Sequence, residues 1–165
     1  MPSKPRTSTR RGTKDVPQPK TAPDERSTLL GFLDYLRERV IAKVDGVGEP
    51  DVRTPGVDSG TNLLGLVKHL GYVERNQFLH QKPASWPTTF TATDEETVQS
   101  LVADYRESIR LANEAIAACS DRGSPVQGRS GPPLRWHLVH AIEETGRHAG
   151  QMDIIRERID GATGR

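Results

Sequence analysis

A carboxylate and an imidazole four residues apart, Glu144 and His148, occupy positions where a helix would normally place apolar core residues. They fall at steps of three and four within the run from Ala141 to Ile155, whose apolar members mark the buried face of a helix. Residues four apart project from one helix face, about 6 Å apart along the axis. Burying such groups without partners costs several kcal/mol, so the spacing predicts a partner from another helix.

The best candidate for that partner is His69, which lies between Leu66 and Val73 on the flank of an earlier apolar stripe. Two neutral imidazoles and one carboxylate from two helices form a familiar ligand set for a divalent metal. Three protein ligands leave room for water or substrate, which favours catalysis or substrate binding. The same residues also fit a surface i,i+4 contact worth a few tenths of a kcal/mol, beside a core histidine. Spacing alone leaves both interpretations open.

Two further polar side chains share the helix face of Glu144 and His148. His140 is four residues before Glu144 and can donate a hydrogen bond to it, as groups behind a metal ligand do. A partly solvated histidine near the helix start is an equally good interpretation of His140. Gln151 is three residues after His148 and can orient it or a bound water. We expect His140 and Gln151 to support the ligands, and Glu143, turned about 100° away, to form an ion pair.

Four stretches of apolar residues recurring at threes and fours predict the helices that position these side chains. The helices are expected at residues 24–44, 62–80, 94–118 and 132–160. Thr93 with Glu96 is typical of a capping box at the start of the third helix. Two prolines start the fourth helix and Gly161 ends it. No stretch alternates as a strand, so we predict an all-α protein, a four-helix bundle.

Several other side chains are assigned from their positions in these elements. The charged residues of the first helix, Arg37 among them, are expected on a solvated face. Glu74 and Gln77 follow on a neighbouring face of the second helix and are expected at the surface or behind the site. Trp86, in the loop before the third helix, can plug the bundle end or wall a pocket. We favour the plug, because large aromatic side chains mostly serve packing.

Length and charge favour one domain with a short tail. The 165 residues are enough for one sizeable core. Residues 1–22 carry six basic residues and one acidic residue, which leaves 17 basic and 21 acidic residues for the remainder. We divide the chain into a disordered basic tail at 1–23 and a bundle domain at 24–165. The mildly acidic body argues against a dedicated nucleic-acid binder.

The remaining composition argues for a protein of the cytoplasm. The single cysteine, Cys119, excludes an intrachain disulfide and suits a reducing compartment. No apolar run approaches the roughly 20 residues of a membrane-spanning helix. The N-terminus has basic residues but no apolar segment of the kind that secretory signals contain.

Two of the predicted helices resemble a known family. The fourth contains HAIEETGRHAGQMDIIRERIDG at 140–161, and the second contains NLLGLVKHLGYVE at 62–74. Both resemble the corresponding helices of the DinB-like superfamily, most closely its actinobacterial, mycothiol-dependent branch, and the resemblance extends over about residues 25–161. It implies a bundle of up-down-down-up topology. It also implies a metal held by one histidine of the second helix and an HxxxH pair of the fourth.

Carried over residue by residue, the resemblance makes His69 and His148 metal ligands. Glu144 stands where the family has the first histidine of the pair, so the match is ExxxH. A glutamate still binds zinc and other divalent ions, but it makes the site harder and less positive. The resemblance thus implies a divalent metal on His69, Glu144 and His148, with zinc first and nickel, manganese or iron as alternatives.

The resemblance also implies thiol chemistry. A metal-bound low-molecular-weight thiol, mycothiol in this branch or bacillithiol elsewhere in the superfamily, would attack an electrophilic small molecule near the Trp86 loop. The hypothesis is a metal-dependent thiol S-transferase in detoxification or stress response. Two alternatives stay open: a non-enzymatic bundle with a structural or vestigial site, acting as a binding or stress-response protein, and a metal-dependent hydrolase or isomerase. The family often forms homodimers, which this sequence neither favours nor opposes.

Overall fold

The computed structural model describes residues 16–20, 22–119 and 131–163. Its four long helices are α1 (Glu25–Val44), α2 (Leu63–Leu79), α3 (Val98–Ala118) and α4 (Leu134–Asp160). Two short 3₁₀ helices, η1 (Asp51–Arg53) and η2 (Pro87–Phe90), interrupt the loops, and the described residues contain no strand. Most of the predicted basic tail lies outside the described residues, so its disorder and the division at residue 23 stay predictions.

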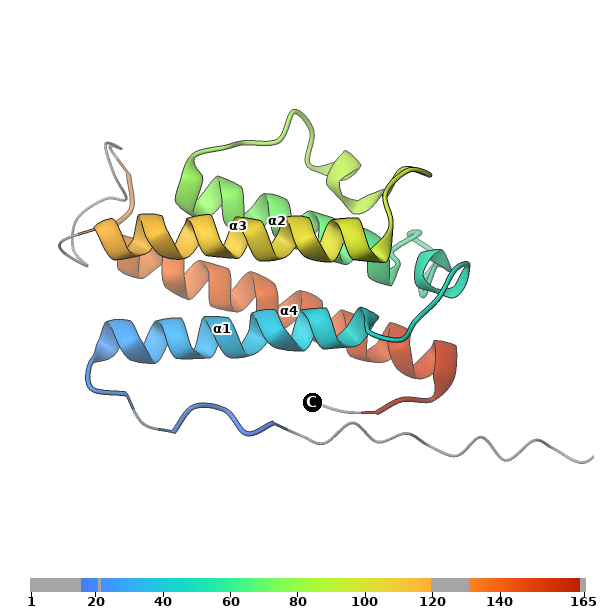
Figure 1. Cartoon of the computed structure of the whole chain (residues 1–165), viewed down its shortest axis with the longest axis horizontal. Helices are drawn as coiled ribbons and strands as arrows, with labels where there is room; N and C mark the ends of the chain where they lie inside the picture. Colours follow the sequence, from blue (N-terminus) through green and yellow to red (C-terminus); the bar gives the residue numbers. More distant parts are fainter. Residues whose placement is uncertain (1–15, 21, 120–130, 164–165) are drawn as a thin grey trace, which may run out of the picture.

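The four helices form two pairs. The two helices of a pair run in the same direction, and the two pairs run in opposite directions. In Figure 1, α1 and α4 run one way and α2 and α3 the other, and the long connection between α2 and α3 returns along the bundle. α1 packs on α4, α2 packs on α3, and α2 also faces α4. The predicted all-α four-helix bundle of up-down-down-up topology is confirmed. The two helices with the candidate ligands, α2 and α4, are therefore antiparallel neighbours.

Capping residues fix where three of the helices begin or end. Asp24 accepts a hydrogen bond from the Ser27 amide at 2.9 Å and caps α1. Asn62 caps α2 in the same way, accepting from the Gly65 amide at 2.8 Å. α4 ends at Gly161, whose φ of 74° lies in the left-handed region that glycine adopts without strain.

The start of α3 differs from the prediction. The helix begins after Thr97, which forms a capping box with Ser100. The Thr93 and Glu96 contact predicted as the cap does form, because the Thr93 amide donates to the Glu96 carboxylate at 2.7 Å. It closes a turn before the helix, and the same carboxylate pairs with Lys68 of α2 at 2.8 Å. The expected helix start is therefore wrong by one turn.

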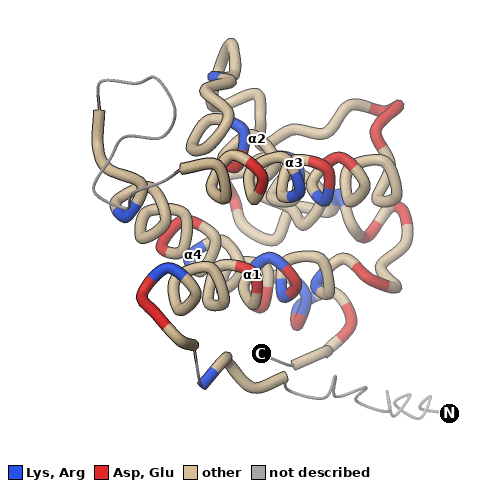
Figure 2. Tube along the Cα trace, turned by 60° about the vertical axis from the view of Figure 1, so that its left-hand side comes forward, with Lys and Arg blue, Asp and Glu red and all other residues tan. Residues whose placement is uncertain are grey.

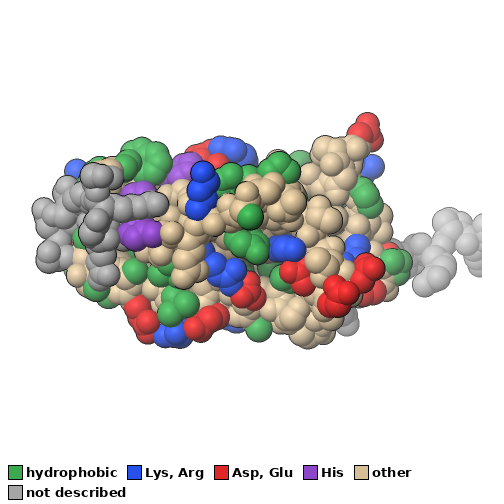
Figure 3. Space-filling model, turned by 90° about the horizontal axis from the view of Figure 1, so that it is seen from above, with side chains coloured by type: hydrophobic (Ala, Val, Ile, Leu, Met, Phe, Trp, Pro, Cys, Tyr) green, Lys and Arg blue, Asp and Glu red, His purple; other side chains and the backbone are tan. Residues whose placement is uncertain are grey.

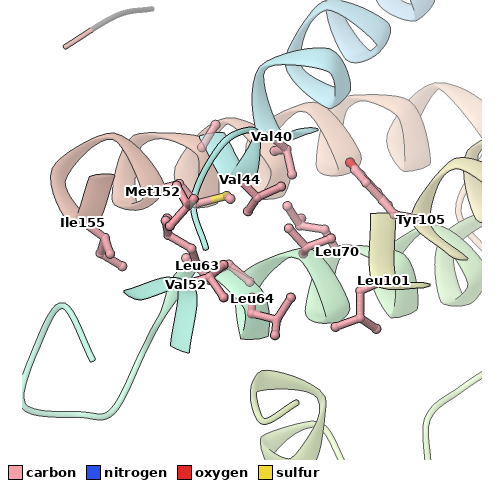
Figure 4. Packing of buried hydrophobic residues seen from close by; sticks show 14 residues of the cluster. Val40, Val44, Val52, Leu63, Leu64, Leu70, Leu101, Tyr105, Met152 and Ile155 are labelled. Atoms are coloured by element: carbon pink, nitrogen blue, oxygen red, sulfur yellow. The ribbon is translucent and has the colours of Figure 1, made fainter. Parts of the chain in front are cut away.

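Buried apolar side chains from all four helices fill the space between them. Figure 4 shows one cluster, in which Val40 and Val44 of α1 meet Leu63 of α2 and Met152 of α4. The second cluster has these buried members: Leu33, Phe78, Ala112, Ile116, Cys119, Leu134, Leu138 and Ala141. Burial of this kind supplies the main favourable free energy of folding.

A buried ion pair links α1 to α2. The guanidinium of Arg37 donates to both oxygens of Glu74, at 2.7 and 2.6 Å, and the two residues are only 1% and 2% exposed. Burial by itself lowers the pKa of Arg37, but the Glu74 carboxylate outweighs burial and raises it. The solvated face predicted for Arg37 and the surface position allowed for Glu74 are both wrong. Periodicity placed each residue on the flank of its own helix but could not show that the two flanks meet.

Most of the other charged residues of the described chain lie on the outside of the bundle, although Lys43 is only 8% exposed. Figure 2 shows basic and acidic residues interspersed along the helices of the described chain rather than separated onto opposite faces. None of the described helices is long and apolar enough to cross a membrane.

Candidate metal centre

The three residues singled out as ligands meet between α2 and α4. His69, Glu144 and His148 each offer one ligand atom, and these atoms all lie within 4.8 Å of one another. His148 Nε2 is 3.3 Å from Glu144 Oε2, and the centroids of the two imidazole rings are 4.9 Å apart. Both histidines are 6% exposed, and the Glu144 side chain is 17% exposed. One ion could be reached by all three side chains.

A hydrogen-bond chain from the η2 loop fixes the tautomer of His69. The Thr89 hydroxyl lies 2.6 Å from the Trp86 carbonyl oxygen, which can only accept, so the hydroxyl hydrogen is donated there. The same hydroxyl oxygen lies 2.8 Å from His69 Nδ1 and must accept from Nδ1–H. Nε2 of His69 is therefore the ring nitrogen that carries the available lone pair. Burial, with a smaller contribution from His148, lowers the His69 pKa to about 4, so the ring is neutral at pH 7 and competent as a ligand.

His148 is held in the corresponding way by Gln151. Its Nδ1 lies 2.8 Å from the Gln151 amide oxygen, which accepts from Nδ1–H and turns Nε2 towards Glu144. Nε2 lies 3.3 Å from the carboxylate oxygen of Glu144, so a proton or a metal ion can bridge these two atoms. With Nε2 of His69, three potential ligand atoms converge on one small region. Two neutral imidazoles and a carboxylate so arranged are a donor set that fits a divalent cation.

A second group of potential ligands lies beside the first and shares Glu144. Ligand atoms of His140, Glu143 and Glu144 also lie within 4.8 Å of one another, and His140 Nδ1 is 3.8 Å from Glu143. Arg147 forms an ion pair with Glu143 and lies 3.3 Å from Glu144 Oε1. The hydrogen bond to Glu143, followed by the charges of Glu144 and Glu143, raises the Arg147 pKa. His140 thus lies among carboxylates, with its side chain 34% exposed.

A cavity of about 380 Å³ opens onto these groups. Its walls are formed by His69, Val73, Asn76, Gln77, Trp86, Phe90, His140, Glu144, Arg147 and His148. Figure 3 shows histidine side chains reaching the surface together near the end where α2 ends and α4 begins. Trp86 therefore walls a pocket, and the plug that the sequence analysis favoured is wrong. Its ring meets the His69 ring edge-on, with centroids 5.7 Å apart.

Sequence reasoning missed the residues that the η2 loop brings to His69. Phe90 stacks on the His69 ring, with the ring centroids 3.8 Å apart, and Thr89 contacts Nδ1 of the same ring as described above. The loop can approach because position 65, one turn before His69, is glycine. A Cβ built on Gly65 would lie 2.0 Å from the Phe90 carbonyl oxygen. A glycine inside an apolar helix pattern often has a packing reason, so Gly65 was the available clue.

Gln77 is the second site residue whose role was not resolved from the sequence. It is 7% exposed rather than superficial, and its amide oxygen lies 2.7 Å from Nδ1 of His137. Steps of four connect His69, Val73 and Gln77, so their common helix face was readable. What could not be read was that α4 would supply a buried histidine opposite the amide.

Comparison with known proteins gives the family. No curated protein matches the chain. A family model described as mycothiol-S-transferase matches residues 28–161, a range that contains nearly all of α1, all of the other three helices and every residue of the candidate centre. The match confirms the resemblance to the mycothiol-dependent branch of the DinB-like superfamily, and the chain belongs to the mycothiol-S-transferase family.

Proposed function

We propose that the protein is a metal-dependent S-transferase, which joins the sulfur of a mycothiol-type thiol to an electrophilic small molecule. The metal ligands in this proposal are His69, Glu144 and His148. The observation that carries it is the convergence of two imidazole nitrogens and a carboxylate oxygen within 4.8 Å of one another, beside a cavity, in a chain of the mycothiol-S-transferase family.

The chain's own contacts prepare the ligands. Thr89 and Gln151 each accept the Nδ1–H of one histidine, so both imidazoles keep Nε2 available and their rings are held in place. A divalent ion, when bound, supplies an open position that takes the thiol sulfur and lowers the thiol pKa, so that thiolate is available at neutral pH. Three protein ligands are the number that leaves such a position.

The cavity walls divide into an apolar and a polar part. Trp86, Phe90 and Val73 present apolar surface around His69, which keeps water away from a nucleophilic sulfur. The amides of Asn76 and Gln77 line the same cavity and offer donors and acceptors to polar groups of the thiol or the electrophile. A volume of about 380 Å³ suits a small organic molecule.

The transfer balances without an oxidant or a reductant. The thiol gives up its proton to solvent, and the sulfur electron pair forms the new bond to an electrophilic carbon. The leaving group departs with the electrons of the bond that breaks or, for an activated alkene, the neighbouring carbon takes up a proton. A redox-inactive ion such as zinc suffices, and nickel, manganese or iron would serve the same role. Detoxification or stress response in the reducing cytoplasm is the biological role that fits this chemistry.

Metal analysis and a thiol-consumption assay test the proposal together. Protein purified without a histidine tag is expected to hold close to one divalent ion per chain, and to consume a mycothiol-type thiol with some members of a panel of epoxides, alkyl halides and activated alkenes. Glu144→Gln and His148→Ala should lose both properties, whereas Glu157→Gln, an exposed glutamate of the same helix, should keep them. Failure to bind zinc, nickel, manganese or iron after each is supplied would refute the metal centre. Metal-dependent melting without thiol consumption would favour a structural site instead, and metal-dependent cleavage by water would favour a hydrolase.

A further inference from the structure

The two oxygens of Glu144 have different neighbours. Oε2 lies 3.3 Å from Nε2 of His148, on the side of the candidate ligands. Oε1 lies 3.3 Å from Nη2 of Arg147, and the same guanidinium nitrogen pairs with Glu143. The carboxylate is thus divided between a ligand side and a guanidinium side.

The guanidinium also lies where a second cation would otherwise be held. Glu143 and Glu144 are two of the three members of the neighbouring group that contains His140. Arg147 pairs with both carboxylates, and its single positive charge offsets one of their two negative charges. A second divalent ion would have to displace this guanidinium, which favours a centre with one ion.

Glutamate at position 144 differs from histidine in how many of its atoms can bind a metal. A histidine nitrogen provides one donor, whereas a carboxylate binds a metal through one oxygen or through both. If both oxygens of Glu144 bound, the second would fill a coordination position that the proposed reaction needs for the thiol. Holding one oxygen away from the ion would keep that position open.

We infer that Arg147 is a positioning residue: it holds Oε1 of Glu144, so that Oε2 alone faces the metal and a coordination position stays free for the thiol. The inference rests on the proposed metal centre and concerns how Arg147 would act on one of its ligands, Glu144. Arg147 would contact the carboxylate ligand and not the reacting atoms. Its side chain is 54% exposed, so the ion pair is screened and modest as a source of stability. Its consequence is expected in the geometry of the centre.

If Arg147 has this role, its removal should affect metal binding differently from the removal of a residue that only supports a metal ligand. Removing the support of a ligand ordinarily weakens metal binding. Removing Arg147 instead frees a second carboxylate oxygen for the metal and takes away a positive charge, so metal binding should persist. The thiol should then bind roughly tenfold more weakly, the lower end of what partners of metal ligands contribute.

The test uses cobalt as the probe, because the visible absorption of Co²⁺ weakens as its coordination number rises from four. Wild type and Arg147→Gln are loaded with Co²⁺, their spectra are recorded, and each is titrated with a mycothiol-type thiol. Arg110→Gln is the matched control. Arg110 is 53% exposed and also pairs with glutamates on its own helix, but it lies on α3. Arg147→Gln should bind the same amount of Co²⁺ with weaker absorption and weaker thiol binding, and Arg110→Gln should match wild type.

A second background removes the carboxylate itself. With Glu144→His the ligand has one donor, so adding Arg147→Gln should change neither the spectrum nor thiol binding. The inference is overturned if Arg147→Gln alone matches wild type, if it loses Co²⁺, or if its effect persists beside Glu144→His. Wild type that binds no Co²⁺ would overturn the proposed metal centre as well, whereas normal loading with an unaltered Arg147→Gln would overturn this inference alone.

Discussion

Replacing Gly65 with alanine tests how the η2 loop is seated on α2 and whether that contact serves His69. The Cβ added by Gly65→Ala would lie 2.0 Å from the Phe90 carbonyl oxygen and 2.9 Å from its carbon, both backbone atoms. A side chain could rotate away from such a contact, but a backbone carbonyl cannot. The loop must move, and Thr89 and Phe90 move with it.

Two opposing effects set the magnitude. Alanine is better than glycine inside a helix by about 1 kcal/mol, which would stabilise the variant. Forcing an extra carbon into a filled space costs about 1–3 kcal/mol, and the approach is more than 1 Å closer than an ordinary contact of roughly 3.5 Å. Gly71→Ala provides the propensity gain without the clash, because its Cβ would meet nothing nearer than 3.7 Å. The difference between the two variants therefore isolates the clash, about 1–3 kcal/mol.

Thermal and urea unfolding of the metal-free variants measure this difference. For a chain of this size about 1 kcal/mol shifts the melting temperature by about 2–4 °C, so Gly65→Ala should melt several degrees below Gly71→Ala. Since displacement of Thr89 releases the His69 tautomer, the affinity of Gly65→Ala for zinc should also fall about 10–100-fold. A Gly65→Ala protein as stable as Gly71→Ala, with unaltered zinc affinity, would refute the argument that the loop positions His69.

Two further substitutions test individual contacts. Thr89→Val keeps the side-chain shape but removes the acceptor for His69 Nδ1–H, so zinc affinity should fall about 10–100-fold in a zinc titration, while Thr88→Val, exposed on the same loop, should bind zinc normally. Equal affinities would count against the tautomer argument. Glu74→Gln removes the buried carboxylate of the pair and leaves Arg37 with the half-exposed carboxylate of Asp34 at 2.7 Å, so urea unfolding should show a loss of about 3 kcal/mol, the lower end of the cost of breaking a buried pair. A loss below about 1 kcal/mol would mean that the pair behaves like a solvated one.

The helices were predictable because their signals are local. Apolar residues at threes and fours marked all four, and the caps at Asp24, Asn62 and Gly161 bounded three of them closely. The start of α3 was missed because two capping patterns follow one another in the sequence. The contact of Thr93 with Glu96 forms, but Glu96 also pairs with α2, so the turn it closes is followed by a second cap.

The candidate ligands were predictable for a different reason. Polar residues on an otherwise apolar helix face are conspicuous, and the resemblance to a known family pointed to the same positions. The loop residues Thr89 and Phe90 had no such signal, because a loop has no periodicity and its path depends on where α2 allows backbone contact. The predictions for Arg37 and Glu74 were wrong for a related reason. Each helix taken alone shows one charged residue that looks superficial, and only the packed pair of helices shows that the two charges are buried together.

The charge of the proposed centre would depend on Glu144, where this chain departs from the HxxxH pattern of the family it resembles. A histidine at position 144 would leave the ligand set neutral, whereas Glu144 would contribute a negative charge and weaken the pull of a divalent ion on a thiolate. A thiolate that is stabilised less is a stronger nucleophile, though a smaller fraction of the thiol is ionised. Arg147 opposes this effect because its positive charge lies against the far oxygen of the same carboxylate. In the proposed centre Glu144 and Arg147 would therefore act on the thiol in opposite directions, and the balance between ionisation and reactivity would depend on how firmly Glu143 holds that guanidinium.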